Sequence, residues 1–108
     1  MFKIQPSPTF WGKVPVGIPG VAKPAMLDIE FQHKKREEIQ AICLRMKDNE
    51  ISPQNIKTTA KEVVVGWKEV DEEFSQDALE LLLENFPSAA SAMVETYLKE
   101  SIEAKGKI

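Results

Sequence analysis

The sequence predicts an α+β fold in which an N-terminal β-hairpin packs on a bundle of about four α-helices. Five of the seven prolines precede Ala25, so the first quarter of the chain cannot be helical. From Lys34 onward, apolar residues instead recur at the three- and four-residue spacing of helices. A chain of 108 residues has the length of one domain, and we expect residues 1–108 to form a single domain.

The β-hairpin is expected at about residues 9–33. Its strands are the alternating runs Phe10–Val16 and Ala25–Gln32, and the second run places apolar and polar side chains on opposite faces. Pro15 has no amide hydrogen to donate, which predicts that the first strand lies at a sheet edge. Residues Gly17–Pro24 form a long, turn-rich tip. Because an isolated hairpin is only marginally stable, we expect it to lie on the helices.

Four helices are expected at about residues 34–48, 52–67, 75–86 and 88–103, followed by a frayed tail at 104–108. Ser52 and Ser75 have the positions of N-caps, with Pro53 as the first residue of the second helix. The second helix is expected to carry its apolar stripe as far as Trp67, and Pro87 ends the third. The short break after Pro87 predicts a tight αα-hairpin between the last two helices.

Composition excludes several classes of function. A net charge of -3 and a pI near 5.2 leave no global positive field, so we expect no binding of nucleic acid. One Cys and one His supply neither a disulfide nor a four-ligand zinc site, and the acidic run 69–73 lacks the alternating ligands of a calcium loop. We therefore predict no metal and no cofactor. Signal-peptide and membrane-spanning runs are both missing from the sequence, which predicts a cytoplasmic protein without a membrane partner.

Two residues could carry chemistry, but both have a simpler interpretation. Cys43 lies on the apolar stripe of the first helix, where a buried, inert thiol is expected. His33 has no nucleophile in a recognisable catalytic motif near it. The basic run His33–Arg36 is followed directly by Glu37 and Glu38, which cancel most of its field. We therefore predict no catalytic residue and no enzymatic activity.

Three apolar residues are candidates for contact with a partner: Trp11, Ile18 and Val21. Trp11 lies in the predicted edge strand. Ile18 and Val21 lie in the Gly- and Pro-rich tip, and exposed apolar residues on a loop frequently mark a contact surface. Packing of the tip onto the helices explains Ile18 and Val21 equally well.

Several short motifs follow one another along nearly the whole chain. They are the strand Phe10–Val16, the strand Leu27–Gln32 leading into His33–Lys34, Gly66–Trp67 with an acidic turn, Phe74–Ser75 before a Leu-rich helix, and Phe86–Pro87 before a helix that bears Tyr97. In their order and spacing they resemble the tail assembly chaperones of long-tailed bacteriophages and prophages. Relatives often carry a longer, Gly-containing insert where this chain has the compressed Val70–Glu73.

The resemblance implies a protein that binds the long, helical tape measure protein and keeps it soluble until tail tube subunits polymerise around it. It implies action in the cytoplasm of the infected or lysogenic host and absence from the mature virion. In many such systems a frameshifted, longer product recruits the tail tube protein. We also expect weak self-association into a homo-oligomer at high concentration.

Two alternatives remain open at this point. The first is a small DNA-binding regulator, since the predicted second and third helices could form a helix-turn-helix pair. Its recognition helix, Ser75–Asn85, would however carry Asp77, Glu80 and Glu84 with no Lys or Arg, which opposes binding in a DNA groove. The second is a structural tail component that stays in the virion.

Overall fold

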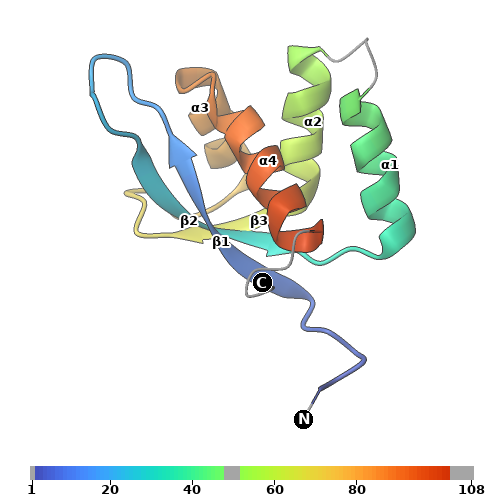
Figure 1. Cartoon of the computed structure of the whole chain (residues 1–108). Coiled ribbons are helices and arrows are strands. Elements are labelled where there is room, and N and C mark those ends of the chain that lie inside the picture. The colour runs from blue at the N-terminus through green and yellow to red at the C-terminus, as the bar shows by residue number, and fades with distance from the viewer. Residues whose placement is uncertain (1, 48–51, 103–108) are drawn as a thin grey trace.

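A computed structural model of the chain describes residues 2–47 and 52–102. It contains an antiparallel sheet of three strands in the order β1-β2-β3, and Figure 1 shows the helices gathered on one face of this sheet. The α+β prediction is therefore confirmed. The elements are, in chain order, β1 (Thr9–Val16), β2 (Ala25–Gln32), α1 (Arg36–Lys47), α2 (Pro53–Val63), β3 (Val64–Lys68), α3 (Gln76–Asn85) and α4 (Ala89–Ile102).

Strand β1 lies at a free edge of the sheet, as Pro15 predicts. It pairs with β2 without a break, from Thr9 opposite Gln32 to Val16 opposite Ala25. One pair beyond the strand end, the His33 amide donates to the Pro8 carbonyl at 2.8 Å. Because bonded and non-bonded pairs alternate along an antiparallel ladder, the amide position of Pro15 faces away from β2. The missing donor of Pro15 therefore costs the sheet no hydrogen bond.

The prediction of a helix over residues 52–67 is wrong at its C-terminal end. Helix α2 ends at Val63, and the chain continues directly as β3, which pairs with β2 and places Trp67 opposite Ile29. The run Val63–Val65 is β-branched and is followed by Gly66, a combination that disfavours helix and favours an extended chain. Gly66 also fits its place for a steric reason, since an added Cβ would lie 2.6 Å from a Glu30 carboxylate oxygen.

The other helices agree with the predicted ranges to within two residues. The Ser52 hydroxyl accepts a hydrogen bond from the Asn55 amide at 3.1 Å, and the Ser75 hydroxyl accepts one from the Ala78 amide at 3.0 Å, so both predicted N-caps are confirmed. Helices α3 and α4 follow each other closely, as the predicted αα-hairpin requires. The predicted helix ends at 48 and 103 and the tail at 104–108 lie outside the described residues.

The hydrophobic core lies between the sheet and the helices. At its centre the rings of Phe10, Phe31 and Tyr97 have centroids 5.5–5.7 Å apart. Tyr97 is fully buried, and its hydroxyl donates to the Gln32 carbonyl at 3.0 Å, which ties α4 to the end of β2. The buried apolar residues are Val14, Val16, Ile29, Phe31, Ile42, Ala60, Val63, Val64, Leu79, Leu83, Ala89, Ala90, Met93, Val94 and Tyr97.

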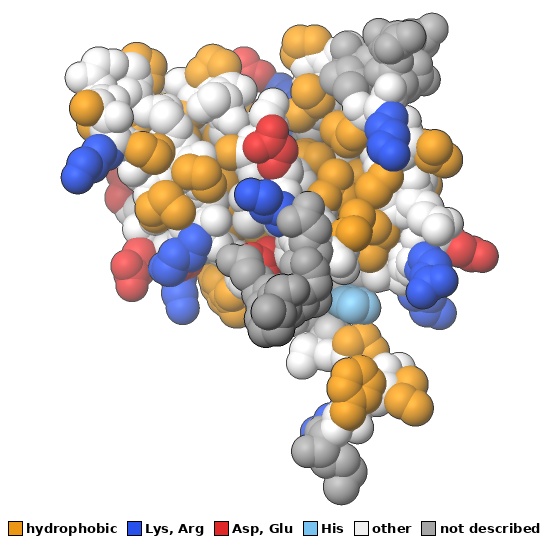
Figure 2. All heavy atoms as spheres, in the orientation of Figure 1, with side chains coloured by type: hydrophobic (Ala, Val, Ile, Leu, Met, Phe, Trp, Pro, Cys, Tyr) orange, Lys and Arg blue, Asp and Glu red, His pale blue; other side chains and the backbone are white. Residues whose placement is uncertain are grey.

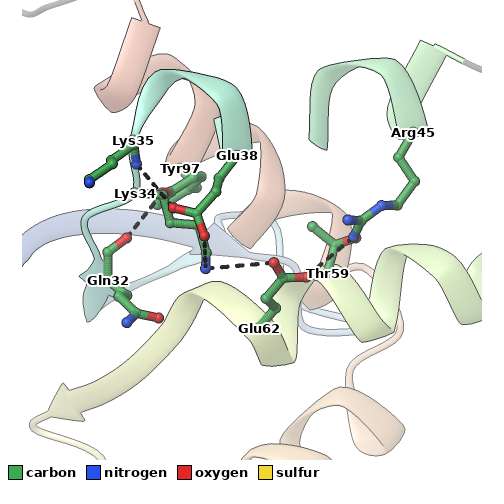
Figure 3. A network of polar contacts seen from close by, with 8 residues as sticks. All are labelled: Gln32, Lys34, Lys35, Glu38, Arg45, Thr59, Glu62 and Tyr97. Carbon is green, nitrogen blue, oxygen red and sulfur yellow. Dashed lines mark hydrogen bonds and ion pairs between the residues drawn. The ribbon is translucent and has the colours of Figure 1, made fainter. Parts of the chain in front are cut away.

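Helix α1 is joined to the rest of the molecule by both apolar and polar contacts. It contributes one fully buried side chain, Ile42. Arg45 donates to the Thr59 hydroxyl at 2.8 Å and pairs with Glu62 at 3.3 Å, and Glu62 also pairs with Lys34 at 3.6 Å. Figure 3 shows this network between α1 and α2, next to the Tyr97 hydroxyl. Lys34 belongs to the basic run of the sequence, and its charge is thus paired with a carboxylate within the fold.

Candidate partner-binding surfaces

The described helices all lie on one face of the sheet, and Trp11 lies on the opposite face (Figure 1). The side chains of β1 alternate, so Val14 and Val16 enter the core while Trp11, Lys13 and Pro15 point to the opposite face. Trp11 is 46% exposed there. Lys13 pairs with Asp28 of the neighbouring strand at 2.5 Å, and this hydrogen bond lowers the pKa of Asp28 and raises the pKa of Lys13.

Trp11 is held across the sheet by charged side chains. The Lys68 ammonium group of β3 lies 4.8 Å from the centroid of the Trp11 ring, a cation–π contact that spans the width of the sheet. Between them, Glu30 of β2 accepts a hydrogen bond from the Thr9 hydroxyl at 2.7 Å. Trp11 is therefore an exposed but oriented aromatic side chain.

The hairpin tip carries the other two predicted contact residues. Ile18 is half-buried, whereas Val21 is 55% exposed. The Val21 amide donates to the Ile18 carbonyl at 3.0 Å, and Gly20 between them has a φ of +83°, which favours glycine. A hollow of about 440 Å³ separates the tip from Pro87 at the turn between α3 and α4. Figure 2 shows hydrophobic side chains gathered around this tip at the upper left.

The structure does not bring the three predicted contact residues into one site. Trp11 lines a separate hollow of about 360 Å³, together with Phe10, His33 and Ile39. None of the residues that line this hollow also lines the one at the hairpin tip. Ile18 and Val21 thus share one surface, and Trp11 belongs to another.

Sequence reasoning missed a groove beside α3, lined by both apolar and polar residues, which we call the α3 groove. It has a volume of about 320 Å³ and is lined by Trp67, Val70, Asp71, Glu72, Ala78, Leu81, Leu82, Asn85 and Phe86. Leu81 is 50% exposed there. The run Leu81–Leu83 carried the signal, because three successive leucines on a helix cannot all face the same core.

Trp67 lines the α3 groove and is held in place by two contacts. Its indole N–H donates to the Glu72 carbonyl at 2.8 Å, and its ring meets Phe74 edge to face, with centroids 5.0 Å apart. The turn that leads from β3 to this loop includes Glu69, whose φ is +60°. The compressed loop after Trp67 is therefore closed onto the indole and shapes one wall of the groove.

The opposite side of α3 is joined to α2 by ion pairs. Glu80 pairs with Lys61 at 2.6 Å and with Lys57, and Lys57 also pairs with Glu84. Hydrogen bonds from Lys57 and Lys61 lower the pKa of Glu80 to about 2. These lysines lie on α2 and do not line the α3 groove.

The residues considered for chemistry are not assembled into a reactive site. Cys43 is half-buried on α1, rather than fully buried as expected, and His33 is exposed after β2. Within residues 2–47 and 52–102, no cluster of His, Cys, Asp and Glu could hold a metal ion. In the same ranges, none of the helices has both the length and the apolar composition needed to span a bilayer. The exposed apolar surfaces are typical of a protein that binds other proteins.

A family comparison agrees with this class. The model of a family described as phage tail assembly chaperone matches residues 1–107, and the chain belongs to this family. The family is non-enzymatic, which confirms that the chain is not an enzyme. Among curated proteins and among solved structures, no match was found. The structure also removes the helix-turn-helix alternative, since β3 separates α2 from α3.

Proposed function

We propose that this chain binds the tape measure protein and keeps it soluble until the tail tube polymerises around it. The observation that carries the proposal is the family match over residues 1–107. The exposed apolar side chains support it, because a chaperone of this kind must cover apolar stripes of a helical client. Trp11, Val21 and Leu81 provide such surface in three places.

The place and time of action form part of the same proposal. The chain acts in the cytoplasm of the bacterial host and is absent from the mature virion. A longer, frameshifted product of the same gene recruits the tail tube protein, and the chain self-associates weakly. Mass spectrometry of purified virions checks the absence from the mature virion, because a retained structural component would be found there in stoichiometric amount.

Co-expression with the cognate tape measure protein tests the function directly. We expect most of the client to stay in the soluble fraction and to co-purify with the chain, because its apolar stripes are covered. In the matched control, the client is expressed with an unrelated small acidic protein and is expected to precipitate. Equal solubility of the client in both cultures would contradict the proposed function.

A further inference from the structure

We propose that the α3 groove is the site that binds a basic amphipathic helix of the client. This assignment rests on the proposed chaperone function and adds to it the surface and the chemistry of the bound segment. It places the principal contact on α3 and the loop after β3, away from the three residues that the sequence singled out.

The first argument is that α3 carries a leucine that does not belong to the core. Leu79 and Leu83 are buried one turn apart, and Leu81 points about 200° away from Leu79 around the helix axis. Leu81 therefore cannot contribute to the core, and it forms one wall of the groove with Ala78 and Leu82. A groove that combines an exposed leucine and other apolar side chains with polar residues along its edge is typical of a binding site for an amphipathic helix.

The second argument is that the groove is fixed in shape before anything binds. Trp67 is held by its hydrogen bond to the Glu72 carbonyl and by Phe74. Helix α3 is fixed at its start by Ser75 and along its far side by the ion pairs of Glu80. A preformed groove binds with a small loss of conformational entropy. Ten residues of helix span about 15 Å, which matches almost three turns of a bound helix.

The third argument is the charge of the rim, which selects the occupant. Asp71 and Glu72 line the groove, and none of its described lining residues is Lys or Arg. Further carboxylates lie close by in sequence, at Glu69, Glu73 and Asp77. Lys68, the nearest cation in the sequence, has its ammonium group over Trp11 on the open face of the sheet. An apolar helix flanked by Lys or Arg complements this rim, whereas an acidic helix places like charges together.

Peptide binding to matched variants tests the proposal. Overlapping synthetic peptides of the cognate tape measure protein are titrated while the fluorescence of Trp67 is followed, with Trp11→Phe in all variants to remove the second tryptophan. We expect peptides with an apolar stripe flanked by Lys or Arg to bind. Leu81→Lys should weaken them by about tenfold or more, as for a central apolar contact.

Leu44→Lys is the matched control, because Leu44 is also an exposed leucine on a helix, at 70% exposure. It should change the affinity by less than about twofold, as expected for a residue outside the interface. Circular dichroism of both variants checks that they are folded. The groove assignment is overturned if the Leu81→Lys variant binds the peptides as tightly as the protein that keeps Leu81, or if the bound peptides are acidic.

Neutralising the rim tests the charge argument separately. The double variant Asp71→Asn with Glu72→Gln should bind basic peptides several-fold more weakly and lose much of the salt dependence of binding. Glu37→Gln with Glu95→Gln removes two exposed carboxylates outside the groove and should leave both quantities unchanged. An identical salt dependence in the two double variants would refute the role of the rim.

Failure of the groove proposal can be told apart from failure of the proposed function. If the unaltered chain does not keep the client soluble, the function itself is wrong. If it does so and Leu81→Lys performs equally well, only the groove is wrong. Light scattering tests whether a second copy of the chain occupies the α3 groove instead of the client. Loss of self-association in Leu81→Lys with unchanged client binding would overturn the assignment to the client.

Discussion

Helices α1 and α3 each present an exposed leucine to solvent, but they bury different numbers of apolar side chains in the core. Helix α3 buries Leu79 and Leu83 in the core, whereas α1 buries Ile42 alone. Both helices form ion pairs with α2, so ion pairs do not distinguish them. The comparison teaches that α3 is anchored in the core more extensively than α1, so a surface built on α3 has a well-defined position.

Truncation of a core anchor of α3 should have the largest effect on the free energy of unfolding. Leu79→Ala removes a fully buried side chain and leaves a cavity, which should cost about 3 kcal/mol. Chemical denaturation measures this loss. Leu81→Ala, two residues further on, is the control and should cost less than about 1 kcal/mol because Leu81 is half exposed. Equal losses for the two variants would mean that the two faces of α3 are not distinct.

Removal of the polar attachment of α1 should have a smaller and more local effect. Arg45→Met keeps an apolar stem but loses the hydrogen bond to Thr59 and the ion pair to Glu62, at a cost of about 1 kcal/mol. Thr59 still donates to the Asn55 carbonyl, so its hydroxyl stays satisfied. Hydrogen exchange should become faster in α1 and stay unchanged in α3. Faster exchange in both helices would break the comparison.

Much of the fold could be predicted from the sequence because its signals are local. Alternation defined both strands of the hairpin, and Ser52 and Ser75 marked two helix starts. The third strand was missed because Val63, Val64 and Trp67 also fit a helical stripe. The free edge of β2 that recruits Val64–Lys68 is a long-range feature, and no local pattern reveals it.

The candidate site was less predictable than the fold for a related reason. Trp11 and Val21 were named from the sequence as candidates for partner contact, and both side chains are exposed. The α3 groove, in contrast, depends on the loop after β3 closing onto Trp67 through the Glu72 carbonyl. A prediction that continued the helix as far as Trp67 placed this indole in the wrong element. A groove beside Leu81 could then not be predicted, because the residue that lines it together with Leu81 was placed elsewhere.

The smallest predicted effect concerns acid, and it tests the ion pairs that join α3 to α2. The pKa of Glu80 is about 2 in the folded chain, below the ordinary value of 4.5, because Lys57 and Lys61 hydrogen-bond its carboxylate. The unfolded chain therefore takes up this proton first as pH falls, so the stabilisation is complete above pH 4.5 and is lost between about 4.5 and 2. Denaturation curves of Glu80→Gln should show a weaker decline in stability across this window.

Asp28→Asn is the control on the sheet, because the pKa of Asp28 is also lowered, by Lys13. The acid dependence of its stability is compared with that of Glu80→Gln. If Glu80→Gln declines as steeply as the unaltered chain, these ion pairs contribute nothing to holding α3, and its apolar anchors alone determine its position.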